Sequence, residues 1–333
     1  MSVRIIQGDC IEAIKTLADE SVQCVVTSPP YFGLRDYGHA GQIGLEATPD
    51  AYVAKLVDVF REVKRVLRDD GTLWLNLGDS YNAAGRTGHG TREGFKQGTN
   101  RASAEFADAC RPNVDDLKPK DLLGIPWRVA FALQADGWYL RQDIIWHKPN
   151  PMPESVRDRC TKSHEYIFLL SKSERYYFDA EAIAEPLAAS SIERLAQPTL
   201  AQQAGSDRVP GKTNGTMKAV GPRFGGAKYG DDTAEEHRTK SGNEWTGSET
   251  GKRNKRSVWT VTTKPFKGAH FATFPPDLIE PCILAGCPVG GTVLDPFGGA
   301  GTTGLVANRK GRNAILCELN PDYVGIAEAR LAA

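Results

Sequence analysis

The sequence lacks the features that mark membrane, secreted and metal-binding proteins. It has no run of about 18 apolar residues, so we expect no membrane span. Its beginning lacks a long apolar core followed by a small-residue cleavage site, so we expect no signal peptide. Seven cysteines are scattered without a Cys-x-x-Cys pair or a histidine cluster at zinc spacing. This pattern predicts reduced thiols, a cytoplasmic protein and no metal site.

An excess of charge of one sign is also missing. Lys and Arg number 41 and are balanced by 41 Asp and Glu, so the formal net charge is zero. Overall charge therefore gives no steering toward nucleic acid, and any such binding has to come from local patches. The length of 333 residues, with 40% hydrophobic and 25% charged residues, is ordinary for a globular protein of one large domain or two modest ones.

Apolar spacing predicts alternating strands and helices at both ends of the chain. Residues 3–7 and 22–26 read as short strands, and Ile11, Ile14 and Leu17 place a helix between them. Similar patterns predict helices at 50–68, at 121–135 and after Pro276, and strands at 72–77, 141–146, 165–170, 291–295 and 313–317. Such alternation is typical of an α/β fold with a mostly parallel sheet.

Two segments differ in character from the rest. Residues 82–113 are Gly-rich, polar and aperiodic, and a loop of this length is usually functional or disordered. Residues 186–257 are rich in Gly, Ser, Thr, Asn and basic side chains, with eleven Lys and Arg against seven Asp and Glu within 205–256. This composition fits a polar linker, and it equally fits a DNA-contacting insert that stays loose until it binds.

A Gly-rich turn, Asp295–Gly304, lies between a predicted strand and a predicted helix. Glycines let a ligand approach the backbone closely, and the helix N-terminus offers free N–H groups. Glu318 ends the next strand, twenty residues past Gly298, where dinucleotide-type folds place an acid for ribose hydroxyls. A P-loop is excluded because no Lys precedes Thr302. The turn predicts a nucleoside site, although a structural loop would also explain it.

The segment Thr27–Tyr31, Thr-Ser-Pro-Pro-Tyr, follows a buried strand and therefore lies at the carboxyl edge of the sheet. Its prolines fix the backbone and remove two N–H donors, so the carbonyls of Ser28 and Pro29 become rigid acceptors. Two acceptors suit an exocyclic amine, because holding both its hydrogens frees the nitrogen lone pair for attack on a sulfonium methyl. Tyr31 would stack on the extruded base. A plain strand-to-turn junction is the alternative interpretation.

Together, the segments Thr27–Tyr31 and Asp295–Gly301 resemble those of the DNA amino-methyltransferases that act on N6 of adenine or N4 of cytosine. The order, tetrapeptide first and Gly turn last, is similar to that of the permuted β class. In this resemblance Asp9 matches the acid near the adenine of S-adenosylmethionine (SAM). Residues 270–275 match the segment around its methionine part, and Trp146–Asn150 matches a segment beside the target base.

The resemblance implies a Rossmann-like SAM-dependent methyltransferase fold with a mostly parallel seven-stranded sheet, helices on both faces and a circularly permuted motif order. The α/β domain would comprise 1–185 and 258–333, with 186–257 as target-recognition insert and 82–113 as a DNA-contacting loop. It further implies double-stranded DNA as partner, base flipping, a homodimer, and either a cognate restriction enzyme or a solitary enzyme of prophage type.

The resemblance also implies site residues. The expected catalytic residues are Ser28, Pro29, Pro30 and Tyr31. The expected cofactor contacts are Asp9, Cys10, Phe271, Thr273, Phe274, Asp295, Phe297, Gly298, Gly299, Ala300, Gly301, Thr302, Thr303 and Glu318. The expected base and DNA contacts are His147, Lys148, Arg86, Arg92, Lys96, Arg253, Lys255 and Arg256.

Other activities fit the sequence less well. Ring-carbon cytosine methylation needs a nucleophilic Cys, usually in Pro-Cys-Gln, whereas Pro281-Cys282 is followed by Ile283. Protein-glutamine and RNA methyltransferases generally carry Asn before the prolines and place the Gly turn first. An inert DNA-binding module would be favoured only if one of the two motifs were broken. Ser28 favours cytosine N4 over adenine N6, which stays open as the alternative.

Overall fold

The computed structural model describes residues 2–34, 37–39, 41–82, 117–195, 252–263 and 274–332. Contacts divide the chain into two compact units. The first unit comprises Met1–Ala182 and Arg256–Ala333, and the second comprises Ile183–Lys255. Within the described residues, no helix has the length and apolar character that crossing a membrane requires.

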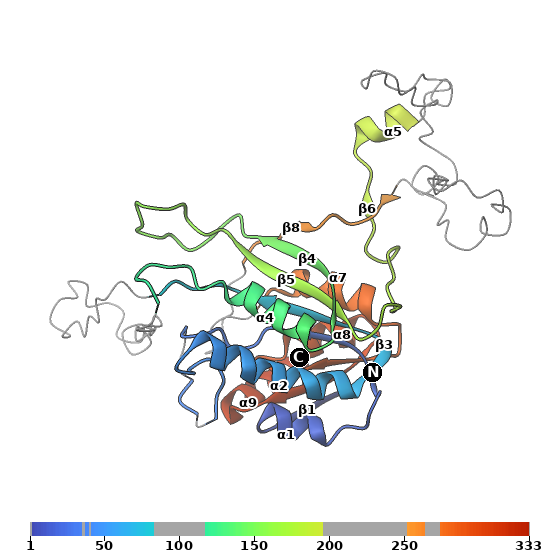
Figure 1. Cartoon of the computed structure of the whole chain (residues 1–333). Helices are drawn as coiled ribbons and strands as arrows, with labels where there is room; N and C mark the ends of the chain where they lie inside the picture. Colours follow the sequence, from blue (N-terminus) through green and yellow to red (C-terminus); the bar gives the residue numbers. More distant parts are fainter. Residues whose placement is uncertain are drawn as a thin grey trace, which may run out of the picture. The chain divides into compact units, whose positions relative to one another are not determined.

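The first unit is built on a single large sheet (Figure 1). In spatial order its strands are β1 (Val3–Gln7), β10 (Asn313–Glu318), β9 (Thr292–Asp295), β2 (Val22–Thr27), β3 (Leu67–Leu77), β5 (His164–Ser171), β4 (Tyr139–His147) and β8 (Val258–Thr260). Strand β5 runs antiparallel to both of its neighbours, and every other pair in this sheet is parallel. The predicted mostly parallel, Rossmann-like sheet is thus confirmed.

The strand count differs from the predicted seven, because the described residues form an eight-stranded sheet. The additional strand is β8, which pairs in parallel with β4 through the register Ile145↔Val258. Its Trp259 is buried and lies 6.4 Å from the ring of Trp74. A three-residue strand of this kind is too short to give a readable alternation, which explains why the sequence did not predict it.

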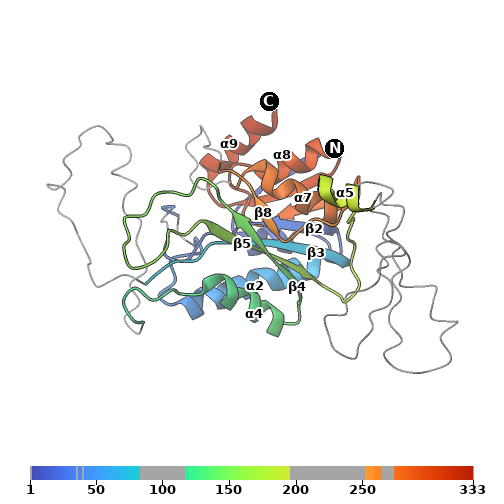
Figure 2. The ribbon, with the colours of Figure 1, turned by 90° about the horizontal axis from the view of Figure 1, so that it is seen from above.

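Helices cover both faces of the sheet, as predicted (Figure 2). One face carries α2 (Pro49–Val66) and α4 (Ile125–Ala135), and α1 (Cys10–Lys15) contacts α2. The other face carries α7 (Pro276–Gly286), α8 (Thr302–Arg309) and α9 (Pro321–Ala332). Helix α2 illustrates the cause: its side chains Tyr52, Leu56, Val59, Phe60, Val63 and Val66 recur every three or four residues and are all fully buried.

The second unit contains a short two-stranded ladder and one helix. Strands β6 (Glu185–Pro186) and β7 (Lys252–Arg253) pair in antiparallel fashion, with Pro186 opposite Lys252. Helix α5 (Ala189–Leu195) follows β6. The ladder brings the beginning and the end of this unit next to each other.

Parallel pairing places the ends of several strands at one edge of the sheet. Strand β2 pairs with β9 through Val25↔Leu294, and β1 pairs with β10 through Gln7↔Glu318. The residues that follow these strands therefore emerge at the same carboxyl edge, where ligand sites of open α/β sheets form. Both predicted motifs, although they come from opposite ends of the chain, lie at this edge.

The packing of α7 on the sheet gives a test of the core. A Cβ added at buried Gly286 would meet Thr72 Oγ1 at 2.5 Å and Trp74 Nε1 at 2.6 Å. We expect Gly286→Ala to lower the free energy of unfolding in urea by about 2 kcal/mol, because overpacking forces neighbours out of place. The control is Gly325→Ala in α9, where a Cβ would meet nothing within 4 Å. The free energy of unfolding of this variant should equal that of the wild type or exceed it by up to about 1 kcal/mol. Equal losses in both would contradict the packing argument.

Candidate active site

The Gly-rich turn joins β9 to α8 and packs closely on its neighbours. A Cβ at Gly298 would stand 2.9 Å from the Cβ of Leu316 in β10, so this position accepts no side chain. Gly301 caps α8 with a φ of 74°, a left-handed conformation that favours glycine. The turn therefore presents bare backbone at the sheet edge, followed by a helix N-terminus.

Two acids lie at neighbouring strand ends, and one of them contacts this turn. The carboxylate of Glu318 accepts hydrogen bonds from the backbone N–H groups of Gly299 and Asn320, both at 2.8 Å. Burial raises the pKa of Glu318. Asp9 caps α1, because its Oδ1 accepts from the N–H groups of Ile11 at 2.9 Å and Glu12 at 3.1 Å. Each carboxylate oxygen has more than one lone pair, so both acids can accept further hydroxyl donors.

Cys10 and Asp295, two of the predicted cofactor contacts, are buried. Burial raises the pKa of the Cys10 thiol to about 12, so this side chain is a neutral packing group. Asp295 is only 1% exposed. It accepts from Thr27 Oγ1 and Thr303 Oγ1, both at 2.6 Å, and from the N–H of Phe297 at 3.1 Å. Asp295 therefore ties the end of β2 to the start of α8.

The proline-containing turn after β2 is fixed from the core. The buried hydroxyl of Tyr52 in α2 donates to the carbonyl of Pro30 at 2.8 Å. The ring of Tyr31 lies against Gly78 at the end of β3, where an added Cβ would stand 2.5 Å from Tyr31 Cε2. Burial, and secondarily the nearby Glu165, hold the pKa of Tyr31 well above its usual range. Tyr31 is therefore a neutral hydroxyl in a defined position.

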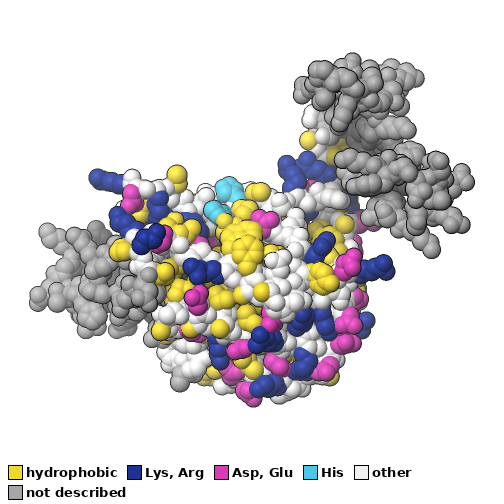
Figure 3. All heavy atoms as spheres, viewed as in Figure 1, with side chains coloured by type: hydrophobic (Ala, Val, Ile, Leu, Met, Phe, Trp, Pro, Cys, Tyr) yellow, Lys and Arg dark blue, Asp and Glu magenta, His cyan; other side chains and the backbone are white. Residues whose placement is uncertain are grey.

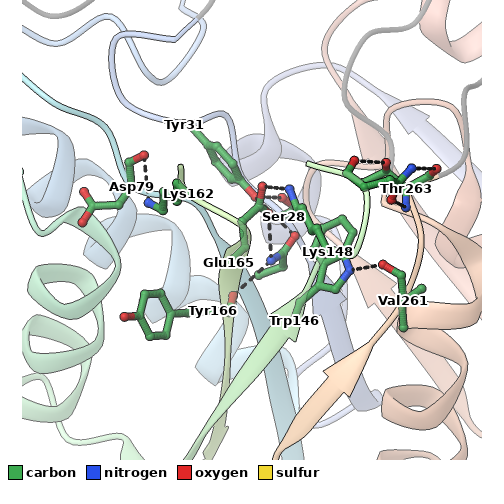
Figure 4. A network of polar contacts seen from close by, with 12 residues as sticks. Ser28, Tyr31, Asp79, Trp146, Lys148, Lys162, Glu165, Tyr166, Val261 and Thr263 are labelled. Carbon is green, nitrogen blue, oxygen red and sulfur yellow. Dashed lines mark hydrogen bonds and ion pairs between the residues drawn. The ribbon is translucent and has the colours of Figure 1, made fainter. Parts of the chain in front are cut away.

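A network of polar contacts surrounds Tyr31 and Ser28 (Figure 4). Tyr31 Oη lies 3.4 Å from Ser28 Oγ and donates to Glu165 Oε2 at 2.8 Å. Glu165 also forms an ion pair with Lys148, whose ammonium lies 4.2 Å from the ring centroid of Trp146. These side chains come from the ends of β2 and β4 and the beginning of β5, and they point toward one another.

The sequence did not single out Glu165 or its neighbour Asn76 as site residues. Glu165 is near the beginning of β5, which would ordinarily lie at the opposite edge of a parallel sheet. Because β5 alone runs antiparallel to its neighbours, its beginning meets the carboxyl ends of β3 and β4. Only strand direction places Glu165 at the site, and no sequence pattern indicates that direction.

The remaining predicted contacts are distributed as follows. His147 ends β4, and its Nδ1 lies 3.2 Å from Thr260 Oγ1. Arg253 and Lys255, in the second unit, lie 3.7 and 3.4 Å from Glu185. Phe297, Gly299, Ala300 and Thr302 lie in or directly after the glycine turn, and Phe274 precedes α7. The carbonyl of Arg256 accepts from Trp259. Arg86, Arg92, Lys96, Phe271 and Thr273 lie outside the described residues.

Basic side chains also occur where the sequence gave no expectation. The connection between β4 and β5 carries Arg157, Arg159 and Lys162, and Figure 3 shows Lys and Arg side chains over this part of the first unit. Acidic side chains are interspersed with basic ones over the whole visible face, and the same connection carries Glu154, which pairs with Arg159, and Asp158, which pairs with Lys120. Because the net charge is zero, any excess of positive charge has to be confined to part of the surface.

The fold and the site together define an open α/β protein with a nucleoside-type turn and a proline-locked strand end at one sheet edge. Comparisons with known proteins are consistent with this class. Residues 22–329 match the family model described as DNA methylase. Type II methyltransferase M.SmaI of Serratia marcescens is 44% identical over 330 residues, covering 99% of this chain and 91% of that protein. Type II methyltransferase M.Cfr9I of Citrobacter freundii is 46% identical, covering 98% and 87%.

Solved structures share the fold. PvuII DNA methyltransferase (cytosine-N4-specific) aligns with a TM-score of 0.60 at 18% identity, covering 99% of this chain and 86% of that one. A putative DNA modification methylase from Thermus thermophilus, complexed with S-adenosyl-L-methionine, aligns with a TM-score of 0.54 at 22% identity, covering 99% and 93%.

The chain belongs to the DNA methylase family: it is a Type II DNA amino-methyltransferase of the N6/N4 group that uses SAM. The family, the enzyme class, the cofactor and DNA as substrate were all predicted from the two motifs and are confirmed. The expected homodimer, restriction partner and prophage-type solitary character stay predictions.

The buried carboxylate of Asp295 predicts a pH-dependent stability. Burial raises its pKa to about 6 in the folded protein. A raised pKa contributes stability that is complete below the unfolded value, about 4, and is lost as the pH rises through about 6. Relative to Asp295→Asn, the wild type should therefore lose about 1 kcal/mol of unfolding free energy between pH 5 and pH 7.

Urea denaturation at a series of pH values measures this difference. Asp58→Asn, on the exposed side of α2, controls for the loss of one negative charge. A constant difference between wild type and Asp295→Asn over the whole range would show that Asp295 is not the group that titrates.

Proposed function

We propose that the enzyme methylates the N4 amine of a flipped cytosine in double-stranded DNA, and that Ser28 and the Pro29 carbonyl accept the two amine hydrogens. The observation that carries this proposal is the link between the two motifs: Asp295 accepts from Thr27, the residue before Ser28, and from Thr303 in α8. A cofactor seated on the glycine turn therefore has the Ser28 segment as its neighbour. No second site is required.

The residues around the turn fit SAM. When bound, this cofactor supplies an electrophilic methyl group on a positively charged sulfur. The glycine backbone at 298–301 leaves room for close approach, because a Cβ at Gly298 would already meet Leu316. Glu318, fixed by Gly299 and Asn320, is placed to accept both ribose hydroxyls, and Asp9 is the acid on the neighbouring strand end. Phe297 through Thr303, together with Phe271, Thr273 and Phe274, would line the methionine side.

Ser28 supports cytosine as the target base. In this family Asp before the two prolines points to adenine, whereas Ser occurs often in cytosine-N4 enzymes. Tyr31 would stack on the extruded base, and His147 and Lys148 at the end of β4 would lie beside it. The Lys148 ammonium, already next to Tyr31 through Glu165, is a donor suited to the acceptor atoms of a base ring.

One experiment identifies both the methylated base and the DNA sequence around it. We expect DNA from a methylation-free host that expresses this protein to contain N4-methylcytosine at one recurring sequence, detected by single-molecule sequencing. The control is the same host expressing Ser28→Ala, which lacks the hydroxyl acceptor and should leave the DNA unmodified. N6-methyladenine at a recurring sequence would contradict cytosine as the target base and would identify adenine instead. Unmodified DNA in both cultures would refute it.

We further propose that residues 186–257 read the DNA sequence, together with the basic loop at 82–113, which includes Arg86, Arg92 and Lys96. Arg253, Lys255 and Arg256 at the end of the insert supply positive charge close to the first unit along the chain. Contacts with phosphates through such side chains would make binding strongly salt-dependent.

The two-stranded ladder of the second unit allows most of the insert to be replaced by a short turn. Pro186 and Lys252 stand opposite each other, so an Asn-Gly turn can replace residues 187–251 without altering the first unit. We expect this variant to bind SAM in calorimetry with wild-type affinity and to lose site-specific methylation in the sequencing assay. The control is an insertion of Asn-Gly alone between residues 186 and 187. Unchanged site choice in the deletion variant would show that the recognition determinants lie elsewhere.

A further inference from the structure

Ser28 stands at one end of a chain of hydroxyl and carboxylate groups (Figure 4). Its Oγ donates to Tyr31 Oη at 3.4 Å, and Tyr31 Oη donates to Glu165 Oε2 at 2.8 Å. Tyr31 Oη also lies 3.2 Å from Asn76 Oδ1. The other Glu165 oxygen, Oε1, forms the ion pair with Lys148. The chain therefore runs from the strand end that would hold the substrate to a carboxylate with its own counter-charge.

The directions of the hydrogen bonds in this chain follow from which groups can donate and which can only accept. Asn76 Nδ2 donates to the backbone carbonyl of Tyr166 at 3.0 Å, and a carbonyl only accepts, so Asn76 presents Oδ1 to Tyr31. An ionised Glu165 also only accepts. The single hydrogen of the Tyr31 hydroxyl thus has two acceptors on one side, and its lone pairs are left for Ser28. Ser28 consequently gives its hydrogen to Tyr31.

The direction of the Ser28–Tyr31 hydrogen bond matters because a hydroxyl can either donate or accept. A Ser28 hydroxyl that donated to the target amine would engage the nitrogen lone pair that the reaction needs. A Ser28 hydroxyl whose hydrogen is held by Tyr31 presents only lone pairs, as an Asp at the same position would. The groups behind the serine occupy its hydrogen and leave only its lone pairs for the amine.

We propose that Glu165 is a positioning residue that acts through Tyr31 to make Ser28 an obligate acceptor for the target amine. The proposal rests on the proposed role of Ser28. Asn76 assists from β3, and Gly78 leaves the space in which the Tyr31 ring is held. Lys148 supplies the positive charge that accompanies the partly buried carboxylate; the side chains of Lys148 and Glu165 are 18% and 16% exposed.

A double-mutant cycle on single-turnover methylation, with saturating SAM and substrate DNA, tests the proposal. Glu165→Gln keeps the shape of the side chain but lets an amide N–H face Tyr31, so we expect the rate to fall about tenfold or more. Tyr31→Phe removes the hydroxyl link and should cause a similar loss. In the Tyr31→Phe background, Glu165→Gln should then change the rate by less than about twofold, because Glu165 has nothing left to act through.

Controls separate positioning from folding and from cofactor binding. Calorimetric SAM affinity should stay within about twofold of wild type for both single variants, whereas Glu318→Ala should weaken it about tenfold or more. Glu62→Gln, which removes an ion pair with Arg65 on α2, should leave the rate unchanged. If Glu165→Gln fails to bind SAM, Tyr31→Phe alone carries the test: an undiminished rate with this variant overturns the proposal.

The possible failures are distinguishable. A wild-type rate in Glu165→Gln, or losses that multiply in the double variant, would overturn the role of Glu165, because the carboxylate would then act by another route such as Lys148. A wild-type rate in Ser28→Ala would instead overturn the proposed function from which this inference starts.

Discussion

The site depends on the hydrogen bonds that the buried carboxylate of Asp295 accepts. Its oxygens accept from Thr27 at the end of β2 and from Thr303 at the start of α8, two points near opposite ends of a chain of 333 residues. Charged groups are rarely buried without partners, and here two hydroxyls and one backbone N–H provide them. The proline-containing turn and the glycine turn are thereby held as one unit, although each belongs to a different end of the sequence.

The groups that fix the backbone of the site and the groups that provide its polar side chains come from different elements. The backbone is fixed from the core side: Tyr52 holds the Pro30 carbonyl, and Gly298 packs against Leu316. The polar chemistry comes from a strand that breaks the parallel pattern, because antiparallel β5 brings Glu165 to the carboxyl edge. The protein has no net charge although it acts on DNA, a polyanion. This is possible because only the surface that contacts DNA needs positive charge.

Much of the fold was readable from the sequence because its strands are buried runs and its helices amphipathic. The strand at 3–7 and the helix after Pro276 occur as predicted, and β3 only begins earlier, at Leu67, because that residue pairs with Val22. The two motifs were readable too, since prolines and glycines impose backbone conformations locally. The short strand β8 was not, because three residues carry too little pattern.

Local sequence specifies the proline-containing turn at 27–31, the glycine turn at 298–301 and the position of Glu318 at the end of the next strand, because neighbours in the chain impose each of them. Tertiary structure alone decided which groups meet. It placed the buried carboxylate of Asp295 between Thr27 and Thr303, and it placed Asn76 and Glu165 behind Tyr31. The physical reason is that strand order and strand direction arise from long-range pairing, whereas motif spacing reports only local geometry.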